Sequence, residues 1–262
     1  MSRFYVPTGY RFKKKEERME IKILDKTEFI EGMKEHLTVN PKTTALVVID
    51  MHQGHLDPEI ATMLVPEEER RRVLTNSKKL IKIVRKYKIP IIHVILQFRP
   101  IEKKLRINPF RESARIVNEK LVFEERSWMG KPELKEGGWE PKIMPEVAPK
   151  GPEEYVINNK KTLSAYYGTD LEHLLRTLKV DTVVIIGINT NTCDLCSSFE
   201  TVNRGFKLIV ISDCVASSYG HDLHIFALQN IARCLGWVLT VPEFEEKLKS
   251  GLREGGILKR KT

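Results

Sequence analysis

The sequence predicts an α/β fold, a three-layer αβα sandwich with a six-stranded, mostly parallel sheet. Several short segments, such as residues 44–49 and 182–186, are apolar at successive positions. Continuous apolar runs of this length are typical of strands that are covered on both faces. Segments with helical spacing alternate with these runs, and strands that alternate with helices favour right-handed parallel connections.

The first half of the chain supplies three of the expected strands. Residues 44–49 form the first strand, and an amphipathic helix over residues 67–87 leads to the second strand at residues 89–96. The third strand is short, at residues 154–157. The next helix starts near Thr169, where Thr169 and Glu172 suit a capping box.

The second half completes the sheet. The strand at residues 182–186 leads through a polar turn into a helix that begins near Cys193, with Cys196, Phe199 and Val202 at helical spacing, and ends at Gly205. A strand at 207–211, a helix at 221–235, a strand at 237–240 and a helix from Pro242 follow.

Three segments flank or interrupt this pattern. Residues 1–40 are charged and irregular, with a short helix expected at 26–36, and we interpret them as an N-terminal arm. A single α/β domain then spans residues 41–250, and residues 251–262 form a basic tail. Residues 99–153 form an insertion with several prolines and a Gly137-Gly138 pair, which is typical of a lid or binding loop.

The composition bounds the class of protein. With 41% hydrophobic and 30% charged residues among 262, the chain is a soluble globular protein, and no apolar run approaches the ~18 residues of a membrane span. The N-terminus has no signal-peptide core, and four cysteines are too few for a disulfide framework, so we expect a cytoplasmic protein. The net charge of +9 comes from Lys and Arg mixed with Glu, which favours an ion-paired surface over nucleic-acid or membrane binding.

A cysteine stands at the most informative position of the chain. In the segment GINTNTC, Cys193 follows a buried strand and precedes a helix. Open parallel sheets place their ligands at this edge, and a helix N-terminus favours the thiolate form of cysteine. Cys193 is therefore a candidate nucleophile, with a buried core thiol as the alternative.

Two charged residues follow neighbouring strands. Asp50 ends the first strand and Lys160 comes just after the third. The carboxylate can take the thiol proton as a general base, the ammonium can hold both anions, and backbone N–H groups can stabilise an oxyanion. Alternatively, Asp50 could cap a helix or turn, and Lys160 could be an ordinary surface lysine.

These residues lie in motifs that resemble the isochorismatase-like cysteine hydrolases over about residues 41–245. ALVVIDMH resembles the first strand of that family with its catalytic aspartate, here Asp50. NKKTLSAYYGTDLEHLL resembles K-x-x-x-S-A-F-x-G-T-x-L, which implies that the catalytic lysine is Lys160 rather than Lys161. GINTNTC resembles G-V-x-T-x-x-C, with Cys193 as nucleophile, and ISDCVAS with HIFALQNIA resembles the segments that follow.

The resemblance has further implications. It implies a cis Ile188–Asn189 bond, with the amides of Asn189 and Cys193 as the oxyanion hole. It makes Tyr166 a pocket wall. Phe98 and Trp128 could also line the pocket, and Arg99 or Arg126 could bind a substrate carboxylate. Ordinary packing and surface exposure are the alternatives for these residues.

Departures from the family pattern narrow the chemistry. The metal-binding nicotinamidases carry D-x-H and a further histidine after the second strand, whereas this chain reads HVILQFRPIEKK, so we expect no metal and no cofactor. His52 and His55 could be ligands, but structural or pocket-rim histidines are favoured. Members that cleave the vinyl ether of isochorismate lack the cysteine, so Cys193 favours amide chemistry. The arm and the insertion resemble those of N-carbamoylsarcosine amidohydrolase and biuret hydrolase.

The predicted function is a cysteine-dependent hydrolase that acts on a carbon–nitrogen bond of a small carbamoyl, ureido or amide substrate and releases ammonia. A dithiol oxidoreductase that uses Cys193 and Cys196 is one alternative, and a non-catalytic binder is another. We also expect a homodimer or homotetramer, because the arm carries Phe4, Tyr5, Val6 and Tyr10 without a core of its own.

Overall fold

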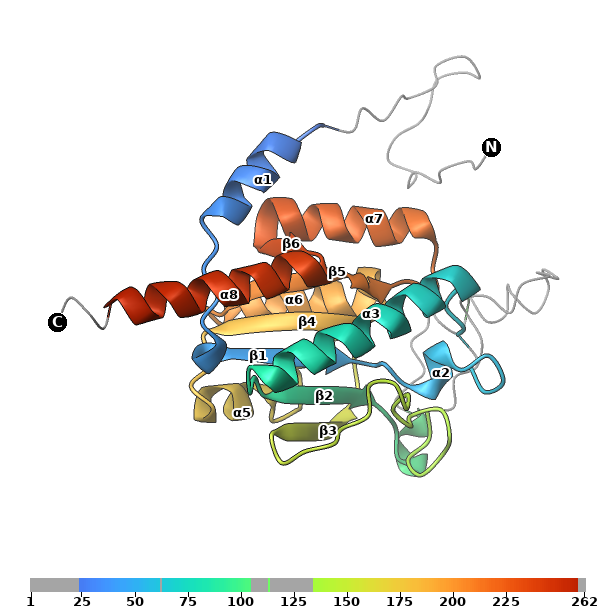
Figure 1. The fold of residues 1–262 in the computed structure, drawn as a ribbon. Coiled ribbons are helices and arrows are strands. Elements are labelled where there is room, and N and C mark those ends of the chain that lie inside the picture. Colours follow the sequence, from blue (N-terminus) through green and yellow to red (C-terminus); the bar gives the residue numbers. More distant parts are fainter. Residues whose placement is uncertain (1–23, 62, 105–112, 114–133, 259–262) are drawn as a thin grey trace, which may run out of the picture.

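A parallel sheet forms the centre of the computed structural model, which describes residues 24–61, 63–104, 113 and 134–258. Its six strands lie in the order β3-β2-β1-β4-β5-β6, and all neighbouring pairs are parallel (Figure 1). The strands are β1 (Thr44–Ile49), β2 (Ile91–Leu96), β3 (Glu154–Lys160), β4 (Thr182–Ile188), β5 (Lys207–Ala216) and β6 (Trp237–Leu239). The predicted fold class is confirmed.

Helices cover both faces of the sheet. The helices along the chain include α1 (Thr27–Glu35), which buries none of its residues, α2 (Gln53–Leu56), α3 (Glu67–Lys86), α5 (Leu171–Thr177), α6 (Leu195–Asn203), α7 (His221–Asn230) and α8 (Val241–Leu258). Helices α3 and α8 lie on one face, and α5 and α6 lie on the other (Figure 1). Helix α8 extends beyond residue 250, where we expected the basic tail to start.

The apolar runs explain the central strands. All residues of β1, β2 and β4 are buried, so each strand contributes side chains to both layers. One core packs β1 and β4 against α3 and α8, and a second packs them against α5. In the edge strand β3 only Ile157 and Lys160 are buried, and the other residues are half-buried or exposed.

Helix α6 buries a polar face. Cys196, Phe199 and Val202, whose spacing predicted the helix, are half-buried or exposed, and Phe199 is 42% exposed. The buried face consists instead of Ser197, Ser198 and Thr201. The hydroxyls of Ser198 and Thr201 donate to backbone carbonyls one turn earlier, so this polar face is buried without unpaired hydroxyl groups.

The chain also differs from expectation at helix starts. A π-helical turn, Thr190–Asp194, separates β4 from α6, so Cys193 lies in this turn and not in the regular helix. Helix α5 begins after Asp170, and Glu172 pairs with arginines instead of closing a capping box. Thr169 nevertheless accepts a hydrogen bond from the Leu171 amide.

The described parts of the insertion return to the carboxyl edge of the sheet. Phe98, just after β2, forms a bridge with Lys135, and His52, just after β1, forms a bridge with Ile143. The described parts of the insertion therefore lie beside the carboxyl ends of β1, which Asp50 follows, and of β2.

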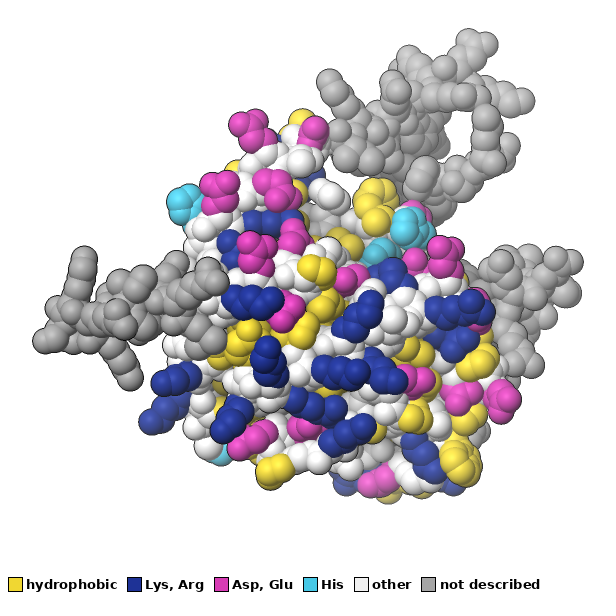
Figure 2. All heavy atoms as spheres, viewed as in Figure 1, with side chains coloured by type: hydrophobic (Ala, Val, Ile, Leu, Met, Phe, Trp, Pro, Cys, Tyr) yellow, Lys and Arg dark blue, Asp and Glu magenta, His cyan; other side chains and the backbone are white. Residues whose placement is uncertain are grey.

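Surface charges are paired along the helices. On α3, Glu67 contacts Arg70 and Arg71, and Glu69 contacts Arg72. Figure 2 shows Lys and Arg interspersed with acidic side chains over the α3 and α8 face. Among the described helices, none combines the length and the apolar character needed to cross a membrane.

Candidate active site

The three predicted catalytic residues meet at the carboxyl edge of the sheet. Lys160 Nζ lies 2.5 Å from Asp50 Oδ2 and 3.4 Å from Cys193 Sγ. The lysine and the aspartate are fully buried, and the cysteine is 4% exposed. In the sequence, Asp50 is 110 positions and Cys193 is 33 positions from Lys160, so the fold brings distant residues together.

Backbone contacts hold Asp50 in place. The residue directly follows β1 with a φ of 50°, and its amide donates to Val94 O at 3.0 Å. Its Oδ1 accepts from Leu96 N at 2.7 Å. One carboxylate oxygen is therefore held by the neighbouring strand, and the other faces the Lys160 ammonium.

The charges of the ion pair stabilise each other. Burial raises the pKa of Asp50, but the charge of Lys160 and the hydrogen bond from it outweigh burial and lower that pKa below its ordinary value. Burial lowers the pKa of Lys160, but Asp50 and Cys193 raise it above its ordinary value. At neutral pH the pair is a carboxylate and an ammonium.

The thiol does not rest as a thiolate. Burial, together with the negative charge of Asp50 and a hydrogen bond with it, raises the pKa of Cys193 to about 12, against the opposing positive charge of Lys160. The expected thiolate at a helix start is therefore wrong for the resting site, because desolvation by full burial outweighs the nearby positive charge. The arrangement instead suits transfer of the thiol proton to Asp50 during the reaction.

The turn after β4 is shaped by close packing. Gly187 has a φ of 154°, and a side chain there would collide with the Ile49 carbonyl oxygen. The predicted cis bond between Ile188 and Asn189 is present. The Asn189 side-chain oxygen accepts two hydrogen bonds from Ser218, from N and from Oγ, both at 2.8 Å.

The oxyanion hole stays a prediction. Asn189 and Cys193 are both buried in the same turn, at 3% and 4% exposure. The Asn189 carbonyl accepts from the amides of Thr192 and Asp194, each at 3.1 Å, which orients the turn.

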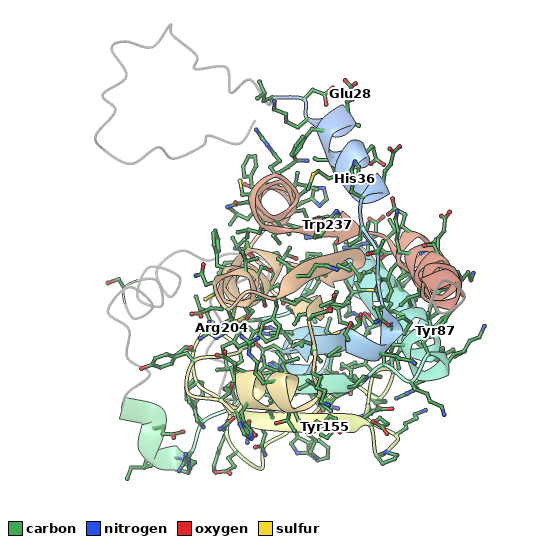
Figure 3. The ribbon with its side chains drawn as sticks, turned by 90° about the vertical axis from the view of Figure 1, so that its left-hand side faces the viewer. Glu28, His36, Tyr87, Tyr155, Arg204 and Trp237 are labelled. Carbon is green, nitrogen blue, oxygen red and sulfur yellow. The ribbon has the colours of Figure 1, made fainter. Side chains whose placement is uncertain are left out.

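Tyr166 lies in the core between α5 and α6. Its hydroxyl is 2.8 Å from Thr201 Oγ1, and the Arg204 guanidinium lies over its ring at 4.6 Å from the centroid. Arg204 also pairs with Glu172 of α5, and Figure 3 shows it between α6 and α5. These contacts connect Tyr166 to α6, and Tyr166 belongs to the same buried cluster as Cys193. Its role as a pocket wall stays a prediction.

The other predicted pocket residues differ in their placement. Phe98 is buried beside Leu96 and Leu134 near the end of β2. Arg99 is exposed and pairs with Glu102 at 3.2 Å. Trp128 and Arg126 lie outside the described residues.

His52 and His55 are buried near Asp50. Their rings stack with centroids 4.6 Å apart, and His55 Nδ1 lies 3.2 Å from Met63 O. Burial lowers the pKa of both, that of His52 to about 3, so both are neutral at physiological pH. Across the described ranges, no three or more His, Cys, Asp or Glu side chains are grouped so that they could hold a metal ion.

One titratable residue escaped the sequence reasoning. Asp194 directly follows Cys193 and is fully buried, and neither carboxyl oxygen has a hydrogen-bond partner among the described residues. An acidic residue next to Cys193 was the available signal.

The four cysteines are all free thiols, and Cys196 is only half-buried.

Comparisons with known proteins agree with this architecture. The family model described as the isochorismatase domain matches residues 44–243. The uncharacterized isochorismatase family protein YwoC of Bacillus subtilis is 28% identical over 213 residues, which cover 81% of this chain and 98% of YwoC. Ureidoacrylate amidohydrolase RutB of Methylobacterium radiotolerans is 31% identical over 115 residues, or 44% of each protein.

Solved structures share the fold. A cysteine hydrolase from Pseudomonas syringae pv. phaseolicola superposes with a TM-score of 0.68 at 22% identity, covering 82% of this chain and 97% of the other. N-carbamoylsarcosine amidase from Thermoplasma acidophilum has a TM-score of 0.57 at 23% identity, covering 76% and 96%. Because the domain model spans most of the chain and the motif resemblance pointed to the same group, the chain belongs to the isochorismatase family.

Proposed function

We propose that this protein is a cysteine-dependent amidohydrolase that cleaves a carbon–nitrogen bond of a small carbamoyl, ureido or amide compound. The observation that carries the proposal is the buried Lys160 ammonium, which contacts both the Asp50 carboxylate and the Cys193 sulfur. A base, a cation and a nucleophile within mutual contact are what acyl transfer requires.

The names of relatives support the reaction class. Ureidoacrylate amidohydrolase, maleamate amidohydrolase and nicotinamidase all act on carbon–nitrogen bonds other than peptide bonds. The matches to ureidoacrylate amidohydrolase and maleamate amidohydrolase cover less than half of those proteins. The substrate class of this chain is therefore proposed here and is not taken from them.

The first half-reaction begins with proton transfer. Asp50 takes the thiol proton while Lys160 holds both groups, and the sulfur attacks the substrate carbonyl carbon. The resulting oxyanion accepts hydrogen bonds from the Asn189 and Cys193 amides. The C–N bond then breaks, protonated Asp50 gives its proton to the departing nitrogen, and a thioester to Cys193 is left.

The second half-reaction restores the enzyme. Asp50, again a carboxylate, takes a proton from water, and the hydroxide attacks the thioester carbonyl. The C–S bond breaks, the sulfur regains its proton from Asp50, and the acid product leaves. A primary amide or carbamoyl group releases ammonia in the first half-reaction.

An ammonia-release screen tests the proposal. The substrates are biuret, N-carbamoyl amino acids, ureidoacrylate, maleamate and nicotinamide. At least one should release ammonia with the wild type, and Cys193→Ala should abolish the release. Cys196→Ala is the matched control and should retain most of the activity, because this half-buried thiol has no part in the mechanism. Equal loss in both variants would favour the dithiol oxidoreductase instead.

A further inference from the structure

A second carboxyl group is buried beside the nucleophile. Asp194 closes the π-helical turn, and its amide donates to Asn189 O at 3.1 Å. Its Oδ1 would lie 2.8 Å from a β-carbon placed on Gly187, so the carboxyl group packs directly against the end of β4. The absence of a side chain at Gly187 is what makes room for it.

This carboxyl group has no partner to stabilise a charge. It is fully buried, and both of its oxygens are without hydrogen bonds among the described residues. An isolated carboxylate in such a place is very costly, so the group takes up a proton instead. The ionisable groups that interact with it are Asp50 at the end of β1, Lys160 at the end of β3 and Cys193 in its own turn.

The surrounding charges favour the same state. Burial and the negative charge of Asp50 raise the pKa of Asp194 well above its ordinary value, and Lys160 opposes them without reversing the shift. Lys160 is already in contact with Asp50 and Cys193.

The protonation state of Asp194 decides the charge of the whole site. With Asp194 neutral, the site is neutral before and after the thiol proton moves to Asp50, because Lys160 balances one anion in each state. With Asp194 ionised, the thiolate would form beside a second negative charge, and like charges disfavour ionisation.

We propose that Asp194 is a positioning residue that works as a neutral carboxylic acid, so that the positive charge of Lys160 is shared by Asp50 and the thiolate alone. The proposal rests on the proposed cysteine mechanism. It implies that ionisation of Asp194 at alkaline pH hinders thiolate formation and so lowers turnover.

Infrared difference spectroscopy detects the proton directly. The wild type should show the C=O stretch of a protonated carboxyl group at neutral pH, and alkaline titration should remove it. Asp194→Asn should lack this band at neutral pH, whereas Asp170→Asn, which changes an exposed aspartate, should keep it. A wild type without the band, or an Asp194→Asn protein that retains it, would overturn the proposal.

Alkylation of Cys193 by iodoacetamide, followed by peptide mass spectrometry, tests the effect on the thiol. At alkaline pH, Asp194→Asn should react about tenfold faster than the wild type, the effect expected when a neighbouring negative charge can no longer form. Near neutral pH the two proteins should react alike. Coinciding profiles across the whole range would overturn the proposal.

Two features keep the test decisive. Asp194→Ser is also neutral and smaller, and it replaces Asp194→Asn if circular dichroism shows that the latter does not fold. Neither measurement needs a substrate. A failure of the proposed function would therefore appear as absent ammonia release, while the infrared band and the alkylation profile would still report on Asp194.

Discussion

Replacing Lys160 with methionine tests the ion pair at the centre of the site. The change keeps much of the side-chain volume but removes the cation that lies 2.5 Å from Asp50 Oδ2. Both groups are fully buried, and breaking such a pair costs about 3–5 kcal/mol because one charge is left unpaired. At about 2–4 °C per kcal/mol for a domain of this size, the melting temperature should fall by roughly 6–20 °C.

In Lys160→Met, the contribution of Asp50 to the pH dependence of the free energy of unfolding should also change sign. In the wild type the pKa of Asp50 is lowered, so its contribution is present above the ordinary aspartate pKa of about 3.9 and is lost as pH falls. The pKa of Lys160 is raised, so its contribution is present below the ordinary lysine pKa of about 10.4 and is lost at higher pH. In Lys160→Met only burial and the weaker neighbours act on Asp50, so its pKa rises above the ordinary value. The variant should then lose stability as pH rises from acid to neutral.

Urea unfolding at several pH values measures both effects. Lys161→Met is the matched control, because Lys161 is partly exposed and pairs with Glu102 near the surface. This control should keep the wild-type pH slope and activity, and Lys160→Met should lose turnover. A Lys160→Met protein with wild-type turnover and an unchanged pH slope would refute the reasoning.

Three further predictions concern the base, metals and assembly. Asp50→Asn should lower kcat by about 10²–10⁴-fold or more, because it removes the general base, and should leave the alkylation profile of Cys193 unchanged or shift it to lower pH; retained turnover would contradict this role. Activity should survive chelators, and purified protein should contain no stoichiometric zinc or iron; a bound metal at His52 or His55 with chelator-sensitive activity would contradict this. Light scattering should show a homodimer or homotetramer, because α1 leaves Phe29 and Met33 exposed at 52% and 40%; a monomer at micromolar concentration would count against it.

The grouping of Asp50, Lys160 and Cys193 could be predicted from the chain because each residue lies at or just after the end of a strand. Continuous apolar runs identified β1 and β4, and parallel strands place their carboxyl ends at one edge. The choice of Lys160 over Lys161 came from the motif. The structure explains that choice, since β3 buries Lys160 and leaves Lys161 near the surface.

Other features depend on packing that the sequence pattern does not encode. Helical spacing indicated the helix itself but not which face is buried, and in the structure Ser197 and Thr201 are buried after the π-helical turn. The same turn buries Asp194, although aspartate side chains are mostly exposed in folded proteins. Tyr166 matched a motif position, but its hydrogen bond to Thr201 depends on the packing of α6 and is not indicated by the motif.

The protonation of the thiol shows a similar limit. A helix start favours a thiolate, and that is all the local sequence indicates. The degree of burial and the hydrogen bond with Asp50 depend on three strands that meet in space, and they reverse the expectation for Cys193.

The central claim is that Cys193 forms a thioester with the substrate. Acid quenching during turnover tests this claim most directly. The wild type is quenched rapidly while it turns over a substrate that releases ammonia. Mass spectrometry is then applied to the peptide that contains Cys193 and Cys196. The account predicts an acyl adduct that fragment sequencing places on Cys193, present in Cys196→Ala and absent in Cys193→Ala. Ammonia release by Cys193→Ala at the wild-type rate, with no adduct on Cys193 in the wild type, would contradict it.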